Sequence, residues 1–145
     1  MRILGLDIGN KRIGVAISDA LGILASPLLV LEHTSDWKDI TTILDLVKQN
    51  GVERIIVGMP LSLNGSAGTQ AEKVIAFTKQ LINKSPVPVV YRDERLTTVT
   101  AKNLHNESVK KRHSKNTRTE YDAMAAAIIL QSFLNETKPL KYPPE

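Results

Sequence analysis

The chain has 145 residues, of which 42% are hydrophobic and 23% are charged, a composition typical of one globular domain that excludes a wholly disordered chain. It contains no cysteine, which excludes disulfides, thiolate zinc sites and cysteine nucleophiles and favours a reducing, cytoplasmic location. No apolar run approaches the roughly 20 residues of a membrane span, and the net charge of +4 favours a polyanionic partner only weakly.

Three apolar runs at the start of the chain predict an antiparallel meander, with strands at 2–8, 12–18 and 23–31. The first two runs are separated by Gly9 and Asn10, a pair that is typical of a hairpin turn. Short connections of this kind join neighbouring antiparallel strands, so we expect the three strands to lie side by side in chain order.

The apolar spacing then changes to three and four residues, which indicates a helix at 36–50. Ser35 can cap its start, Gly51 can end it, and Trp37 belongs to its core-facing stripe. We then expect, in chain order, a strand at 53–58, a helix at 68–83, a strand at 87–91, a short helix at 97–106, a loop at 106–118 and a last helix at 120–135. Pro88 indicates that its strand lies at a sheet edge, or that the strand starts there.

Strands that alternate with helices are typical of parallel strands joined by right-handed crossovers. The sequence therefore predicts one α/β domain at 1–138. Its mixed five-stranded sheet combines a three-stranded antiparallel meander with two parallel strands and is flanked by helices. Residues 139–145 are expected to form a disordered tail.

Three acidic residues stand where strands end or helices begin. Asp7 interrupts the end of the first apolar strand, Glu94 follows the strand at 87–91, and Asp122 lies in the first turn of the last helix, on its apolar face. We therefore expect the three carboxylates to converge at the carboxyl ends of the strands. Oxygen ligands without cysteine favour Mg²⁺ or Mn²⁺ over zinc, and such ions support phosphodiester hydrolysis.

Each of these acids also has a purely structural interpretation. Asp122 could cap the helix start together with Thr119, and Glu94 could form a surface ion pair with a neighbouring arginine. A buried strand end offers Asp7 fewer such roles. The residues alone leave these alternatives open.

The segment 92–118 is strongly basic. Its eight cations and three acids give it a charge of +5, so the rest of the chain sums to −1. The segment is either a solvated loop or a surface that contacts phosphates without reading base sequence, and two of the proposed catalytic acids frame it. The cations predicted to bind nucleic acid in this part of the chain are Arg95, Lys110, Lys111, Arg112, Lys115 and Arg118.

Four ordered segments of the chain resemble the YqgF family, the bacterial RuvX-type Holliday junction resolvases, which are also described as nucleases of pre-16S rRNA processing. The matching segments are GLDIGNKRIGVAISD at 5–19, IIVGMPLSLNGSAGTQAEKV at 55–74, DERLTT at 93–98 and YDAMAAAIIL at 121–130. The resemblance covers residues 2–135 and implies an RNase H-like fold, in agreement with the predicted order of elements.

The resemblance also implies roles for individual residues. Asp7, Glu94 and Asp122 would be the catalytic acids that bind the metal, with Asp93 auxiliary. Arg95 would place phosphate or hold a neighbouring carboxylate. Lys11 and Arg12 follow the hairpin turn and could meet the nucleic-acid backbone, or could belong to an ordinary solvated turn. The residues before Tyr121 depart from the usual pattern, which leaves the start of the last helix open.

The leading hypothesis is a Mg²⁺- or Mn²⁺-dependent nuclease that processes the 5′ end of pre-16S rRNA. The alternative is a Holliday junction resolvase acting on branched DNA, which needs a two-fold dimer, so both monomer and homodimer stay open. A phosphotransferase of the actin and hexokinase type has a similar glycine-rich hairpin but needs two such domains. A non-catalytic nucleic-acid-binding module is disfavoured because all three acids are present.

Overall fold

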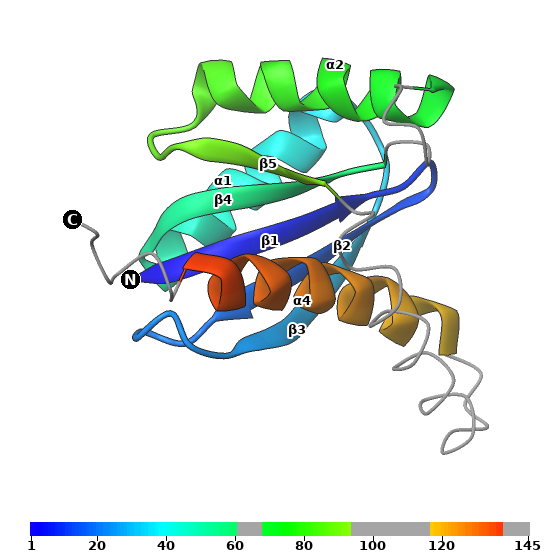
Figure 1. Ribbon diagram of the computed structural model, residues 1–145. Coiled ribbons are helices and arrows are strands. Elements are labelled where there is room, and N and C mark those ends of the chain that lie inside the picture. Colours follow the sequence, from blue (N-terminus) through cyan, green and yellow to red (C-terminus); the bar gives the residue numbers. More distant parts are fainter. Residues whose placement is uncertain (61–67, 94–116, 138–145) are drawn as a thin grey trace.

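A five-stranded mixed sheet forms the centre of the computed structural model, which describes residues 1–60, 68–93 and 117–137 (Figure 1). Its strand order is β3-β2-β1-β4-β5. The predicted meander and its two parallel additions are confirmed. The antiparallel strands are β1 (Arg2–Ile8), β2 (Arg12–Ser18) and β3 (Ala25–Glu32), and the strands parallel to β1 are β4 (Val52–Met59) and β5 (Val89–Asp93).

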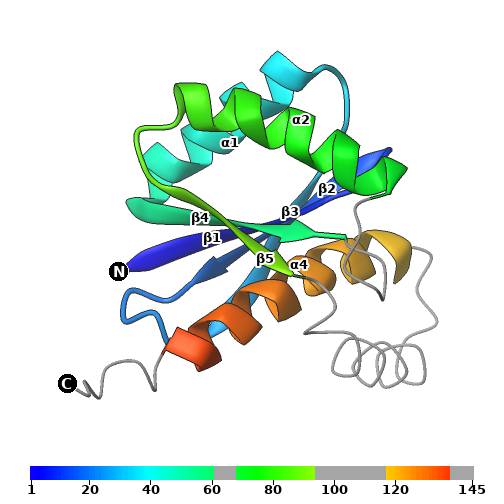
Figure 2. The same ribbon diagram turned by 45° about the horizontal axis from the view of Figure 1, so that its top comes forward.

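Helices cover both faces of this sheet. The helices α1 (Asp36–Asn50) and α2 (Thr69–Lys84) share one face, and α4 (Thr117–Thr137) crosses the other face, where it contacts β1, β2 and β3 (Figures 1 and 2). Within the described part of the chain, no helix is both long enough and apolar enough to span a membrane.

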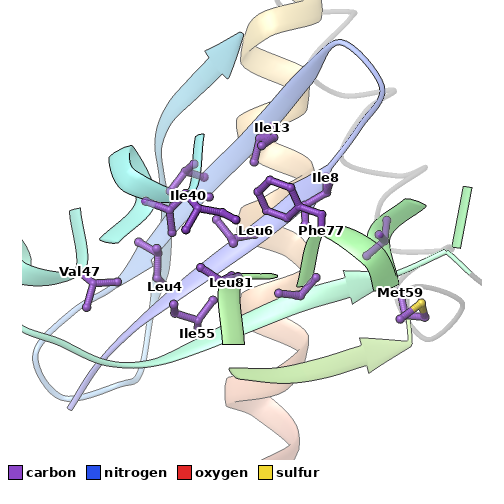
Figure 3. Close-up of a cluster of buried hydrophobic side chains, with 14 of the residues drawn as sticks. Leu4, Leu6, Ile8, Ile13, Ile40, Val47, Ile55, Met59, Phe77 and Leu81 are labelled. Atoms are coloured by element: carbon purple, nitrogen blue, oxygen red, sulfur yellow. The ribbon is translucent and has the colours of Figure 1, made fainter. Parts of the chain in front are cut away.

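Two apolar layers hold the helices on the sheet because alternate residues of each strand point to opposite faces. Leu4 and Leu6 of β1 are fully buried in the layer beneath α1 and α2 (Figure 3). Ile3, from the other face of the same strand, packs in the second layer with Ala126 and Leu130 of α4. The face of β1 that carries Ile3 is therefore the face that α4 covers.

The predicted ends of α1 are confirmed. The side chain of Ser35 accepts a hydrogen bond from the backbone N–H of Lys38, at 3.4 Å, and Gly51 closes the helix in the left-handed conformation with φ of 63°. Both residues satisfy backbone groups that the helix itself leaves unpaired. The sequence signals for start and stop were sufficient here because capping is a local interaction.

The prediction that Trp37 belongs to the core is wrong, because its side chain is 58% exposed. Trp37 lies in the first turn of α1, at the margin of the apolar stripe that Ile40 continues. The buried position in that turn belongs to Asp39, which is only 4% exposed and is bonded to His33 and Thr34. These polar partners let a carboxylate replace an apolar side chain there.

The third strand starts two residues later than the predicted range of 23–31 and spans Ala25–Glu32. The Asp19 side chain accepts hydrogen bonds from the backbone N–H groups of Ile23 and Leu24, at 2.7 and 3.2 Å. These bonds hold both residues in the turn between β2 and β3. The side chain of the residue that follows β2 therefore sets the boundary, which apolar periodicity does not reveal.

Pro88 precedes β5, which is an edge strand that spans Val89–Asp93 rather than 87–91. Proline has no N–H to donate, yet its carbonyl oxygen accepts a hydrogen bond from Ile55 N–H of β4, at 2.9 Å. The expectation that Pro88 marks an edge strand is thus confirmed, with Pro88 one residue before the first residue of that strand. The bounds of β4 and α2 lie within one residue of the predicted ranges.

The last helix begins at Thr117, three residues before the predicted start of the range 120–135. Asp122 therefore lies in the second turn of α4, not in the first. This placement removes the interpretation of Asp122 as a residue that only caps the helix start, because capping acts on the first turn. The predicted helix at 97–106 and the predicted tail at 139–145 lie outside the described residues.

Candidate active site

Asp7 lies near the carboxyl end of β1 and is partly buried. Since side chains alternate along a strand, it shares the α4 face with Ile3 and Gly5, whereas Leu6 and Ile8 pack beneath α1 and α2. An acid on a face otherwise covered by apolar residues of α4 is costly unless it interacts with other groups. The strand therefore aims this carboxylate toward the space at the start of α4.

Asp122 reaches the same place from α4, because Gly14 lets the helix backbone touch the sheet. Gly14 is the cross-strand partner of Asp7 in the β1–β2 pair. A Cβ atom added to Gly14 would collide with the carbonyl oxygen of Asp122 and lie 2.7 Å from its carbonyl carbon. The two predicted acids thus lie on either side of one glycine. Their roles as catalytic residues stay predictions.

Arg12 forms an ion pair with Asp122. Its Nε atom donates to the Oδ2 atom of Asp122 at 2.6 Å, and the two side chains are 27% and 26% exposed. Arg12 was predicted as a contact for the nucleic-acid backbone, and its pairing with Asp122 was missed. The signal was present in the hairpin register, since Arg12 and Gly14 alternate onto the same face of β2.

The turn between β1 and β2 is tied to the start of α2. Gln70 donates from Nε2 to the carbonyl oxygen of Ile8 at 3.1 Å, and Nζ of Lys73 lies 3.3 Å from Oδ1 of Asn10. Figure 1 shows this turn and the first turns of α2 and α4 at the same end of the sheet. Lys11, a predicted nucleic-acid contact, is exposed in this turn.

Arg92 connects the carboxyl end of β5 to the far end of α4. Its side chain is 13% exposed, pairs with Glu136 and donates from Nη2 to the Ser132 hydroxyl at 2.8 Å. No hydrogen-bond partner is found for its buried Nε atom among the described residues. Ser132 and Glu136 were missed by the sequence analysis, although their spacing of four residues places them on one helix face.

The third predicted acid, Glu94, lies outside the described residues, as do Arg95, Lys110, Lys111, Arg112 and Lys115. Arg118 falls in the first turn of α4, but its side chain is also outside the described part. Among the described residues alone, no group of three His, Cys, Asp or Glu side chains could hold a metal ion. The complete triad of acids and the basic contact surface therefore stay predictions.

The family model described as RuvX: Holliday junction resolvase matches residues 1–136. The chain belongs to this family. Membership confirms the resemblance inferred from the four sequence segments. The match includes both described acids and the residues outside the described part, from Glu94 to the start of α4.

Relatives of similar length match almost end to end. A protein from Desulforudis audaxviator is 45% identical over 138 residues, which cover 95% of this chain and 96% of the relative. One from Caldanaerobacter subterraneus subsp. tengcongensis is 44% identical over 138 residues, covering 95% of this chain and 99% of the relative. Both carry the name "Putative pre-16S rRNA nuclease".

Solved structures share the fold at much lower identity. RuvC of Thermus thermophilus, in complex with a Holliday junction substrate, has a TM-score of 0.62 and 14% identity, covering 94% of this chain and 96% of RuvC. The fowlpox virus Holliday junction resolvase has a TM-score of 0.53 and 20% identity, covering 94% of this chain and 99% of that one. At these identities the likeness concerns the fold, which agrees with the RNase H-like architecture expected from the sequence.

Proposed function

We propose that the protein is a metal-dependent nuclease that hydrolyses phosphodiester bonds and processes the 5′ end of pre-16S rRNA in the cytoplasm. The observation that carries the proposal is the approach of α4 to Gly14, because it puts Asp122 beside the strand position of Asp7. Support for the substrate comes from the names of full-length relatives at 40 to 45% identity. The description of the family, Holliday junction resolvase, supports a nuclease of structured nucleic acid.

Two of the described residues offer ligands that suit a hard divalent cation. Asp7 and Asp122 carry carboxylate oxygens, and Gly14 lets the helix that carries Asp122 lie against the strand next to Asp7. Oxygen donors of this kind suit Mg²⁺ or Mn²⁺, and the chain has no cysteine to favour a softer metal. Asp7, Asp122 and Glu94 are the residues that would hold the ion. When bound, it would stabilise the charge that develops on the phosphodiester and activate water for hydrolysis.

The cationic residues of the chain would bind the substrate backbone around this centre. Lys11 is exposed at the hairpin turn, at the end of the sheet where Asp7 lies. The segment 92–118, with its charge of +5, enters α4 immediately before Asp122. Contacts of lysine and arginine to phosphates do not read base sequence, so the shape of the RNA would select the cleavage position.

The decisive experiment compares cleavage of an RNA that carries the pre-16S rRNA 5′ end with cleavage of a four-way DNA junction. Each substrate is incubated with the full chain in Mg²⁺, in Mn²⁺ and in EDTA. We expect cleavage of the RNA in either metal, no cleavage in EDTA, and little cleavage of the junction. Efficient cleavage of the junction alone, together with a dimer in light scattering, would replace this proposal with the resolvase alternative.

Matched variants test the site itself. Asp7→Asn and Asp122→Asn remove one carboxylate charge each, and we expect either change to abolish cleavage while RNA binding is kept. Asp45→Asn removes the same charge from an exposed position on α1 and serves as the control. Wild-type cleavage rates in both site variants would show that the metal centre has been placed wrongly.

A further inference from the structure

The guanidinium group of Arg12 is hydrogen-bonded to one carboxylate oxygen of Asp122, a residue proposed to bind the metal. Nε of Arg12 and Oδ2 of Asp122 are 2.6 Å apart, a short distance that is typical of a charge-assisted hydrogen bond. The backbone of Asp122 lies against Gly14 and cannot move far. A second cation that binds the Asp122 carboxylate therefore comes close to the Arg12 guanidinium.

A divalent ion on Asp122 would place a like charge within a few ångströms of this guanidinium. Like charges at that distance repel, and each disfavours the other's binding to the shared carboxylate. Of the two partners, Arg12 is the one able to leave. Its side chain is long, is 27% exposed, and starts at the first residue of β2, beside the exposed turn that contains Lys11.

We propose that Arg12 is the counter-cation of Asp122 in the metal-free protein and that a divalent ion displaces it. This inference rests on the proposed function, since it needs Asp122 to bind the metal. Once displaced, the guanidinium lies beside the metal centre with all its donors available. Its planar fork matches a phosphate group in two parallel hydrogen bonds, so the released side chain would bind the RNA backbone next to the scissile bond.

The opposite arrangement is that Arg12 stays on Asp122 and orients it for the metal. The two arrangements predict metal affinities that change in opposite directions. If Arg12 competes with the ion, Arg12→Gln removes the competitor and tightens metal binding. If Arg12 orients the carboxylate, the same substitution loosens metal binding because the carboxylate loses its support.

Calorimetric titration of the full chain with MnCl₂ alone separates these arrangements without any cleavage. For Arg12→Gln we expect Mn²⁺ to bind about two- to five-fold more tightly, the factor that corresponds to losing a partly exposed ion pair. Arg2→Gln is the matched control. It removes an arginine charge from the other end of β1, where Nη1 lies 3.4 Å from the carbonyl oxygen of Ser18, and should leave Mn²⁺ affinity unchanged. Unchanged or weaker binding by Arg12→Gln overturns the inference.

A second measurement follows the ion pair in the wild-type chain itself. The Nε–Hε resonance of Arg12 in ¹⁵N NMR, assigned by its loss in Arg12→Lys, reports the bond to Asp122 directly. We expect it to shift and to exchange faster with water as Mg²⁺ is added. A resonance that stays constant while Mg²⁺ saturates overturns this inference alone, whereas a chain that binds neither Mg²⁺ nor Mn²⁺ overturns the proposed function as well.

Discussion

Gly14→Ala is the substitution that should separate the acids of the site with the smallest chemical change. The added Cβ would collide with the carbonyl oxygen of Asp122 and lie 2.7 Å from its carbonyl carbon and 3.3 Å from the backbone nitrogen of Ala123. These atoms belong to the helix backbone and cannot rotate away. To bring the carbonyl carbon alone to an ordinary contact of about 3.5 Å, α4 must move roughly 1 Å from β2, and the nearer carbonyl oxygen requires somewhat more.

Two consequences of this displacement can be measured. Overpacking of this kind costs about 1–3 kcal/mol of unfolding free energy, or roughly 3–10 °C in Tm for a chain of this length. A misplacement of about 1 Å in a catalytic group lowers kcat by about 100-fold. We therefore expect Gly14→Ala to unfold at lower temperature by circular dichroism and to lose nearly all RNA cleavage.

Gly51→Ala is a control that lowers stability without moving Asp122. Gly51 has φ of 63°, so alanine there is strained, but a Cβ would meet nothing within 4 Å. We expect a loss of about 1 kcal/mol, with kcat unchanged at a temperature where both variants are folded. A Gly14→Ala variant that keeps wild-type kcat would refute the claim that this glycine sets the position of Asp122.

Two further predictions concern polar contacts outside the site, at Asp19 and at Arg92. The N–H of Ile23 stabilises the Asp19 carboxylate and lowers its pKa below the usual 3.8, so this contribution is complete above about pH 4 and is lost as pH falls through the lowered pKa. Asp19→Asn should therefore be less stable than wild type in urea unfolding near neutral pH, by a deficit that shrinks as the pH falls below about 4; a constant deficit would contradict this. Arg92→Met leaves the Ser132 hydroxyl and the Glu136 carboxylate without their donor, so it should lower the unfolding free energy by about 1–3 kcal/mol. Glu136→Gln should lower it by less than about 1 kcal/mol, because the Glu136 side chain is 56% exposed. Equal losses in the two variants would show that Arg92 contributes only a surface ion pair.

The fold could be predicted because its signals are local. Apolar alternation located β1 and β2, and capping by Ser35 and Gly51 located α1, since each depends on neighbours in sequence. The errors arose where a polar side chain bonded the backbone of a turn or took a buried position. Asp19 shortened β3 at its start, and Trp37 was exposed because the turn it occupies buries an aspartate instead.

The placement of Asp122 could be predicted only in part. Helical periodicity gave its inward face, and the family resemblance gave its expected role. The ion pair with Arg12 and the approach to Gly14 depend on how α4 crosses β2, between residues 110 positions apart. No pattern within one element contains that crossing. The hairpin register places Arg12 and Gly14 on one face of β2, and only the crossing of α4 brings Asp122 to that face.

Two glycines explain how α4 can hold a carboxylate in a defined position. At Gly5 an added Cβ would lie 2.8 Å from Cβ of Leu130 and 3.1 Å from the carbonyl oxygen of Ala126, and at Gly14 it would collide with Asp122. The helix therefore lies against the backbone of β1 and of β2 at two points, one to two turns apart. Two contacts of this kind limit both the depth and the rotation of the helix, because their nearest atoms are backbone atoms and a Cβ atom, which side-chain rotation does not move. The catalytic role proposed for Asp122 needs its carboxylate placed within about 0.5 Å, and this pair of glycines supplies the rigid support from which Asp122 reaches the strand position of Asp7.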